Sequence, residues 1–266
     1  MLTIAEKINA TIPSVKAIIE KRDEAALLEL ARSQSEAGAD YLDVNVGTGS
    51  GGQQEEIESM RWAVELIQSA VETPLCIDSA DPEVLQAGLG MRGGRPSLIN
   101  STKGAPSSLE RILPLAKEYD TPLVGLAMDE KGIPATVGER VNACAVIASA
   151  CSSMGIGLDQ IFFDPLVLPV STDVSQGKVT LKTIEAVKSE FPQAKTVMAV
   201  SNVSFGLPRR HIFNTAFLHM ALYAGLDGAI MNVADEKLMG AVRTAEAVLG
   251  RDRHCRKYAK YWRTRT

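Results

Sequence analysis

Short acidic and amide side chains follow the apolar runs of this chain along most of its length. Carboxylates accept hydrogen bonds, and amides both accept and donate them, so such a set suits a polar, planar, nitrogen-rich ligand. Any one of these residues fits a helix N-cap equally well, but caps could as well be Ser, Thr or Gly. The recurrence therefore favours a binding site made of Asp43, Asn45, Asp78-Ser79, Asn100-Ser101-Thr102, Asp164, Ser201-Asn202 and Asn232.

The placement of the histidines argues against two common chemistries. His211 and His219 fall within an expected helix and His254 within the C-terminal tail, so no histidine follows a strand. A Ser-His-Asp triad and a three-histidine zinc site both need histidine beside the ligand. We therefore expect neither nucleophilic hydrolysis nor an intrinsic metal.

A glycine-rich segment, Gly47-Thr-Gly-Ser-Gly-Gly52, offers a competing interpretation. It matches G-x-G-x-x-G between an expected strand and a helix that starts near Gln53, which is the setting of a dinucleotide phosphate loop. However, it follows the second strand, and the acidic Asp43 on that strand would repel a pyrophosphate. A mobile loop that covers the ligand, or that leaves room for a bulky partner, is the better use of these glycines.

Short apolar runs of strand length alternate with longer amphipathic stretches from one end of the chain to the other. These amphipathic stretches predict helices. The runs predict eight strands at Thr3–Ile8, Tyr41–Val46, Leu75–Ile77, Ser97–Ile99, Leu123–Ala127, Gln160–Phe163, Thr196–Val200 and Gly228–Met231.

Several expected helices carry start signals. Ser107 with Glu110 and Thr136 with Glu139 have the spacing of a capping box, and Asp81-Pro82 offers an N-cap followed by proline. Pro114 lies inside an apolar helical pattern and should kink that helix or delay its start.

Alternating strands and helices predict parallel strands, and eight such units in about 250 residues favour a single-domain α/β (β/α)8 TIM barrel. An open doubly wound sheet is the structural alternative. We expect the barrel to span residues 1–250 and a basic C-terminal tail to span 251–266, which could pack on the barrel, form dimer contacts or be disordered. In a barrel the polar strand ends gather at one end, where barrel enzymes have their active sites.

Composition limits the classes of partner and the cellular compartment that we expect. The chain has 266 residues, a net charge of −4 and no sustained basic stretch before its end, so nucleic acid is not an expected partner. It has no apolar run of transmembrane length and no signal-peptide pattern, so we expect a cytoplasmic protein that does not bind membranes. Its four cysteines, without a C-x-x-C pair, are expected to be reduced thiols.

Six segments resemble the pterin-binding methyltransferases, the family of methyltetrahydrofolate:corrinoid/iron–sulfur protein methyltransferases and methylcorrinoid:tetrahydrofolate methyltransferases. The order and spacing of the segments are more specific than any one of them. They are IAEKIN near the start, Leu42-Asp-Val-Asn-Val-Gly47, Cys76-Ile-Asp-Ser79, Ile99-Asn-Ser-Thr102, Phe163-Asp-Pro-Leu166 and Val200-Ser-Asn-Val-Ser-Phe-Gly206.

The resemblance implies a pterin-binding barrel in which Asp78, Asn100 and Asp164 bind the pterin ring and Asn202 lies close to N5 as the catalytic residue. Arg210 would face the glutamate tail or the pterin edge, although Arg209 is equally available. The remaining expected pterin-binding residues are Asp43, Asn45, Met128 and Ser201. Lys7 stands where the family often has Arg, and the glycine-rich stretch is unusually long.

The implied reaction moves a methyl group between N5 of tetrahydrofolate or 5-methyltetrahydrofolate and the cobalt of a corrinoid. No D-x-H-x-x-G cobalamin signature is present, so the corrinoid (cobalamin) should arrive on a partner protein. The resemblance also suggests a homodimer. The alternatives are a dihydropteroate synthase-like enzyme, which should have an Arg-x-His signature after the last strand, and a non-catalytic folate-binding subunit.

Overall fold

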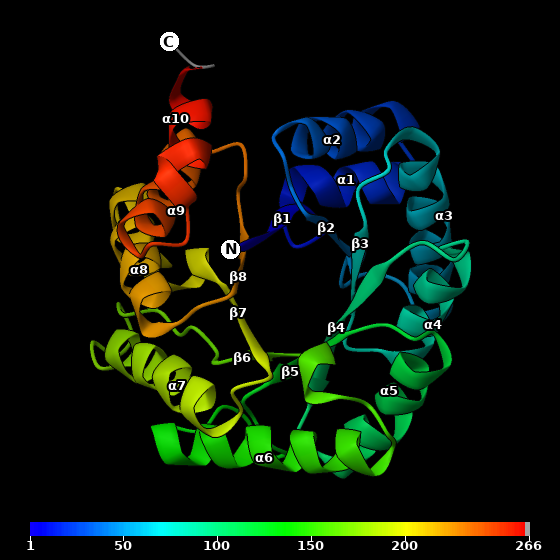
Figure 1. The fold of residues 1–266 in the computed structure, drawn as a ribbon. Helices are drawn as coiled ribbons and strands as arrows, with labels where there is room; N and C mark the ends of the chain where they lie inside the picture. Colours follow the sequence, from blue (N-terminus) through cyan, green and yellow to red (C-terminus); the bar gives the residue numbers. More distant parts are fainter. Residues whose placement is uncertain (264–266) are drawn as a thin grey trace.

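The computed structural model describes residues 1–263, in which eight parallel strands form a closed barrel (Figure 1). Each strand pairs with its neighbours in sequence, and β8 pairs with β1. The (β/α)8 prediction is therefore confirmed. The strands are β1 (Leu2–Asn9), β2 (Tyr41–Asn45), β3 (Leu75–Asp78), β4 (Ser97–Lys103), β5 (Leu123–Leu126), β6 (Ile161–Asp164), β7 (Lys195–Ala199) and β8 (Gly228–Met231).

Helices form a ring around the strands (Figure 1). They are α1 (Pro13–Lys21), α2 (Glu24–Glu36), α3 (Gln53–Ala70), α4 (Pro82–Met91), α5 (Pro106–Glu118), α6 (Val137–Ser153), α7 (Gln176–Glu190), α8 (Arg210–Ala224), α9 (Glu236–Val248) and α10 (Arg256–Arg263). Three short 3-10 helices, η1 (Leu158–Gln160), η2 (Val200–Ser204) and η3 (Arg253–Cys255), complete the elements.

Most predicted strand ends differ from the observed ones by one residue, but the predicted β4 is too short. The strand continues through Asn100, Ser101 and Thr102 to Lys103, so these polar residues belong to the strand and do not follow it. The pairing with β5 shifts register between Asn100 and Thr102, and a cis peptide bond joins Asn100 to Ser101.

Two of the three predicted helix starts are confirmed. Thr136 and Glu139 form a capping box, and the Asp81 side chain accepts the N–H of Glu83 across 2.8 Å. The predicted Ser107–Glu110 box is wrong, because α5 already begins at Pro106 and its N-cap is Ala105. Pro114 lies inside α5 and does not delay its start.

Inward-facing side chains fill the barrel in layers, because successive residues of a strand point to opposite faces. One layer is apolar and buried, and it consists of Ile4, Cys76, Leu98, Val124, Phe162, Val197 and Ile230. The outward-facing residues pack against the helices in a larger hydrophobic core.

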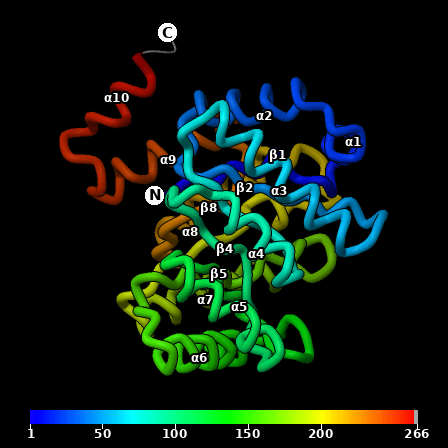
Figure 2. The backbone as a smooth tube through the Cα atoms, turned by 90° about the vertical axis from the view of Figure 1, so that its right-hand side faces the viewer, coloured from blue at the N-terminus to red at the C-terminus, as the bar shows by residue number. Residues whose placement is uncertain are grey.

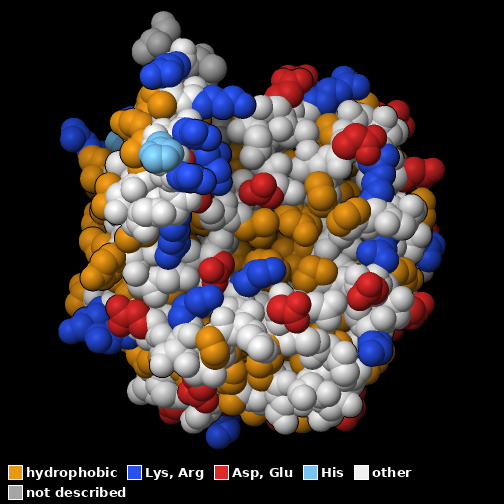
Figure 3. All heavy atoms as spheres, in the orientation of Figure 1, with side chains coloured by type: hydrophobic (Ala, Val, Ile, Leu, Met, Phe, Trp, Pro, Cys, Tyr) orange, Lys and Arg blue, Asp and Glu red, His pale blue; other side chains and the backbone are white. Residues whose placement is uncertain are grey.

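The two ends of the barrel differ. The N-terminus and α10 lie on one side of the molecule, and the loop that enters α3 lies on the other (Figure 2). Figure 3 shows the end where the strands begin, with hydrophobic side chains at its centre and Lys and Arg side chains gathered over α9 and α10. The opposite end, where the strands end, is called the mouth.

The basic tail packs on the barrel over the residues that the structure describes. Helix α10 contacts α9, and the Trp262 ring approaches Gly240 so closely that a Cβ there would lie 2.9 Å from it. Residues 264–266 of the predicted tail lie outside the described residues, and the boundary at residue 250 stays a prediction. Within residues 1–263, the helices are all too short or too polar to cross a bilayer.

Candidate active site

A polar ring at the mouth follows directly from strand periodicity. Two residues beyond each member of the buried apolar layer, the side chain returns to the barrel interior one layer nearer the mouth. Most of these positions hold acids or amides: Glu6, Asp78, Asn100, Asp164 and Asn232, with Leu126 and Ala199 between them. Strand β2 departs from the pattern, since it has Asp43 in the buried layer and Asn45 in the ring.

Four of the predicted site residues form one hydrogen-bonded network. Asn45 Nδ2 donates to Asp78 Oδ2 across 2.9 Å, and Asn100 Nδ2 donates to Asp43 Oδ1 across 3.3 Å. A side-chain hydrogen bond between Asp43 and Asp78 joins these two pairs. The network thus spans three neighbouring strands and offers both carboxylate acceptors and amide donors.

Burial changes the ionisation of the two acids in this network. The pKa of Asp43 is raised well above its ordinary value, first by burial and then by the negative charge of Asp78. Burial also raises the pKa of Asp78, which the hydrogen bond from Asn45 opposes. Two adjacent buried carboxylates disfavour double ionisation, so the pair retains a proton to higher pH than exposed acids would.

Asp164 ends β6 and is held by the loop that follows it. Its Oδ1 accepts the N–H of Leu166 across 2.8 Å, and its side chain is buried. Burial raises the pKa of Asp164 to about 7, although the Leu166 N–H and the positive charge of Arg140 both lower it. Asp164 is therefore an acceptor whose charge changes near neutral pH.

The residues predicted after β7 lie on the short helix η2. The Asn202 side chain is exposed, whereas Ser201 is half-buried and its hydroxyl donates to Glu6 across 3.2 Å. Arg210 donates to the Ser201 carbonyl across 2.6 Å and to the Ser204 hydroxyl across 3.1 Å. The Arg210 guanidinium thus stabilises the turn of Asn202, and its contact with a ligand stays a prediction.

Glu6 is a candidate site residue that the sequence interpretation missed. It lies two residues beyond buried Ile4 on β1, and it reaches Ser201 at the end of β7. Burial raises its pKa, while Lys7, the Ser201 hydroxyl and Arg210 lower it. Strand alternation through IAEKIN was the signal that could have found it.

Two further predictions concern the edge of the mouth. Met128 lies just beyond β5, and its carbonyl accepts the N–H of Gly104 across 2.8 Å. The predicted contact of its side chain with a ligand stays a prediction. The glycine-rich loop runs from β2 to α3 and holds Gly49 and Gly51 at φ of 68° and 91°. Glu55 and Glu56 occupy the first turn of α3, where a pyrophosphate would have to bind, so their charge opposes the dinucleotide interpretation.

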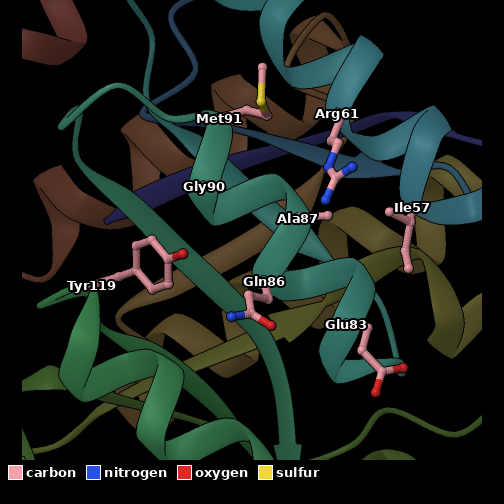
Figure 4. A pocket seen from close by; sticks show the side chains of 8 residues that line it. All are labelled: Ile57, Arg61, Glu83, Gln86, Ala87, Gly90, Met91 and Tyr119. Carbon is pink, nitrogen blue, oxygen red and sulfur yellow. The ribbon is translucent and has the colours of Figure 1, made fainter.

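A groove of about 710 Å³ lies on the outside of the barrel, away from the mouth. Side chains of α3 and α4 line it, together with Tyr119 at the end of α5 (Figure 4). It includes no member of the polar ring, so we place the candidate site at the mouth.

Comparisons with known proteins match most of the chain. A family model described as "Pterin binding enzyme" matches residues 5–232. A methylcorrinoid:tetrahydrofolate methyltransferase of Eubacterium limosum is 38% identical over 265 residues, which is 99% of this chain and 96% of that protein.

More distant similarities extend to other proteins. Methionine synthase of Mycobacterium leprae is 31% identical over 249 residues, which is 88% of this chain and 20% of that protein; the chain thus spans about a fifth of it. The 7,8-dihydropteroate synthase of Vibrio fischeri has a TM-score of 0.72 at 16% identity, covering 94% of this chain and 93% of that one. At that identity the likeness shows the barrel fold alone.

Proposed function

The chain belongs to the family of pterin-binding enzymes, and from this membership we propose that it moves a methyl group between N5 of tetrahydrofolate and the cobalt of a protein-bound corrinoid. The observation with most weight is the similarity, over nearly the full length of both chains, to a methylcorrinoid:tetrahydrofolate methyltransferase. The polar ring at the mouth supplies the site on which that reaction would occur.

The pterin would be held by the ring acids and amides. A pterin edge presents several N–H donors beside a carbonyl oxygen, so it pairs with carboxylates and with amides that both donate and accept. Asp78, Asn100 and Asp164 offer these groups from β3, β4 and β6. Binding favours the ionised forms of the acids, because a carboxylate accepts the pterin N–H groups.

Chemistry at N5 needs help with a proton. A tertiary amine is a poor leaving group, so N5 must gain a proton or a strong hydrogen bond before its methyl group departs to cobalt(I); in reverse, neutral N5 attacks methylcobalt(III). Asn202, exposed on η2, would donate the hydrogen bond but cannot supply a net proton. We assign the proton to Glu6, whose raised pKa keeps it protonated to higher pH than an exposed glutamate.

The corrinoid would approach the mouth from outside as a substrate carried by a partner protein. The enzyme contributes positioning for in-line transfer and electrostatic help at N5, with no covalent protein intermediate. The glycine-rich loop lies beside Asn45, and because its glycines have no side chains, it leaves space for a bulky partner.

We further propose that the protein is a homodimer in the cytoplasm. Its four cysteines are unpaired thiols, as expected in a reducing compartment. The outer face of α8 exposes Phe213, Met220 and Tyr223, the last of them 79% exposed. Large exposed apolar side chains on one helix favour burial against a second copy.

An anaerobic spectral assay tests the main proposal. Enzyme is mixed with 5-methyltetrahydrofolate and cob(I)alamin, or with tetrahydrofolate and methylcobalamin, and the cob(I)alamin absorbance is followed. We expect exchange by the natural protein, and much slower exchange by Asn202→Ala with folate binding retained. If folate binds and a corrinoid protein is supplied but no exchange occurs in either direction, the protein is a non-catalytic folate-binding subunit instead.

A dihydropteroate synthase would behave differently in a parallel assay. It would join a dihydropterin diphosphate to the amine of p-aminobenzoate, forming dihydropteroate and releasing diphosphate. We do not expect this reaction here, because β8 is followed by Asn232-Val233-Ala234 rather than by an Arg-x-His triplet.

A further inference from the structure

Arg140 is a fully buried cation on the outer helix α6, with 0% of its surface exposed. Its Nε donates to the carbonyl of Pro134, one terminal nitrogen donates to the carbonyls of Pro165 and Leu166, and the other donates to Gln176 Oε1, all within 2.8 to 3.0 Å. These four acceptors are uncharged. A buried guanidinium is costly unless its donors are bonded, so this placement demands a reason.

The acceptors of Arg140 belong to two loops at the mouth. Pro134 lies in the loop between β5 and α6, and Pro165 and Leu166 open the loop between β6 and α7. Gln176 is the first residue of α7, at the far end of that second loop. One side chain therefore fixes both ends of the β6–α7 loop and ties it to the loop before α6.

This arrangement holds Asp164 in place. Leu166 has a φ of 64°, in the left-handed region that a leucine rarely adopts, and its N–H is the group that donates to Asp164. The Leu166 carbonyl accepts from Arg140 and, across 3.2 Å, from the Thr180 hydroxyl. Without the guanidinium, Leu166 would relax toward an ordinary conformation, and its N–H would turn away from Asp164.

The same loop also supports the turn that includes Asn202. The N–H of Val170 donates to the carbonyl of Val203 across 3.1 Å, and the Ser171 hydroxyl donates to the carbonyl of Phe205 across 2.7 Å. Both bonds join the β6–α7 loop to residues that closely follow Asn202. A loop fixed by Arg140 therefore fixes η2 as well.

We propose that Arg140 is a positioning residue, which touches no substrate but sets the orientation of Asp164 and of the Asn202 turn for pterin binding and methyl transfer. The inference rests on the proposed function. It adds a residue from the outer helix ring to a site otherwise built from strand ends.

Charge contributes alongside geometry. Among residues 1–263, the titratable groups that interact with Asp164 are Arg140 and Cys144, both on α6, while the ring positions on the neighbouring strands β5 and β7 are Leu126 and Ala199. Burial raises the pKa of Cys144, so its thiol stays neutral near pH 7. Arg140 is thus the charged group that favours the Asp164 carboxylate.

The test compares three variants by tetrahydrofolate binding across pH and by methyl-transfer kinetics. Arg140→Gln keeps hydrogen-bonding capacity but removes the charge; we expect about tenfold weaker binding at pH 7 and a binding midpoint about one pH unit higher. Arg140→Lys keeps the charge but not the planar guanidinium, so the pH midpoint of binding should match that of the natural protein while kcat falls. Arg92→Gln is the matched control, because Arg92 also donates to backbone carbonyls, those of Arg95 and Tyr119, but lies near Ser97, where β4 begins.

The outcomes separate the inference from the proposed function. If the natural protein binds no tetrahydrofolate, the proposed function fails. If it does bind, and Arg140→Gln has the midpoint and affinity of the natural protein, the positioning role is overturned. Should Arg140→Gln not fold, Arg140→Lys decides the matter, since unchanged kcat and KM in that variant would also overturn it.

Discussion

Asn45 on β2 donates a hydrogen bond to Asp78 on β3 across 2.9 Å, and this bond opposes the effect of burial on the Asp78 carboxyl. A donor of this kind favours the charged acceptor, and its loss raises the acceptor pKa further. The pair therefore links an amide that sequence spacing singled out to the ionisation of its neighbour.

Replacing Asn45 by Ala should weaken tetrahydrofolate binding about tenfold at neutral pH, since a hydrogen bond to a charged group contributes about 1.5–3 kcal/mol. The deficit should shrink as pH rises, because the Asp78 carboxylate is restored at higher pH. Fluorescence titration from pH 6 to 9 measures both effects, with the exposed Asn142→Ala as control. An equal deficit at every pH would show that Asn45 acts by contact alone.

Glu6→Gln tests the proton assignment. The variant cannot carry a proton to N5, so transfer from 5-methyltetrahydrofolate should slow roughly a hundredfold, the lower range for general acid catalysis. In the natural protein this rate should fall as pH rises through the raised pKa of Glu6, and the variant should lack that fall. Stopped-flow rates measured across pH test the assignment, and the exposed Glu65→Gln is the control. A retained fall would assign the titrating group elsewhere.

Asp164→Asn should stabilise the fold while abolishing tight pterin binding. The pKa of Asp164 is about 7 in the folded chain and near 4 in the unfolded chain, so the folded state binds the proton more tightly. As pH rises from about 4 to about 7, the natural protein loses folding free energy on the order of 4 kcal/mol through this group. The asparagine variant escapes that loss, so its advantage should grow over this window and then level off.

Urea unfolding at pH 5 and pH 8 measures the difference, with the exposed Asp159→Asn as the reference substitution. The linkage would be contradicted if the stability advantage of Asp164→Asn over the natural protein were smaller at pH 8 than at pH 5.

Local rules are enough to predict most of this fold from its sequence. Apolar runs located all eight strands, and Thr136 and Asp81 marked two helix starts, because such preferences act within a few residues. The failed box at Ser107 shows the limit of the same rules: Pro106 already begins α5, and the neighbouring Ser108 hydroxyl pairs instead with Thr102 on β4.

The residues missed from sequence depend on contacts between distant segments. Glu6 meets Ser201 across 195 positions of sequence, and Arg140 meets Leu166 and Gln176 across 26 and 36. No local spacing encodes such contacts, and Arg140 on a helix otherwise looks like a surface residue. Period-two alternation from Ile4 could have placed Glu6 on the inward face of its strand, but it could not have identified Ser201 as its partner.

The dimer proposal predicts that the outer face of α8 is buried against a second copy in solution. Met220→Glu with Tyr223→Glu should convert the protein to monomers, because two carboxylates would be desolvated in the interface. Val146→Glu is the control, since Val146 is 48% exposed on α6 instead. Sedimentation velocity distinguishes the forms, and a dimer that survives the double substitution would place the interface on another face.

The loop at the mouth offers the sharpest test of corrinoid docking. Gly52 is the N-cap of α3 with a φ of −100°, and a Cβ added to it would meet no atom within 4 Å, so a larger side chain fits without backbone strain. Gly52→Phe adds bulk beside the proposed docking surface, and Gly52→Ser adds little while keeping a good cap.

We expect Gly52→Phe to lower kcat/KM for a corrinoid protein by roughly tenfold, which corresponds to about 1.4 kcal/mol. Gly52→Ser should match the natural protein, and free methylcobalamin should be less affected than the corrinoid protein in either variant. Tetrahydrofolate affinity should not change, because Gly52 lies outside the polar ring. Equal losses with free and protein-bound corrinoid would mean that the loop obstructs the mouth itself, and no loss with either would remove this loop from the docking surface.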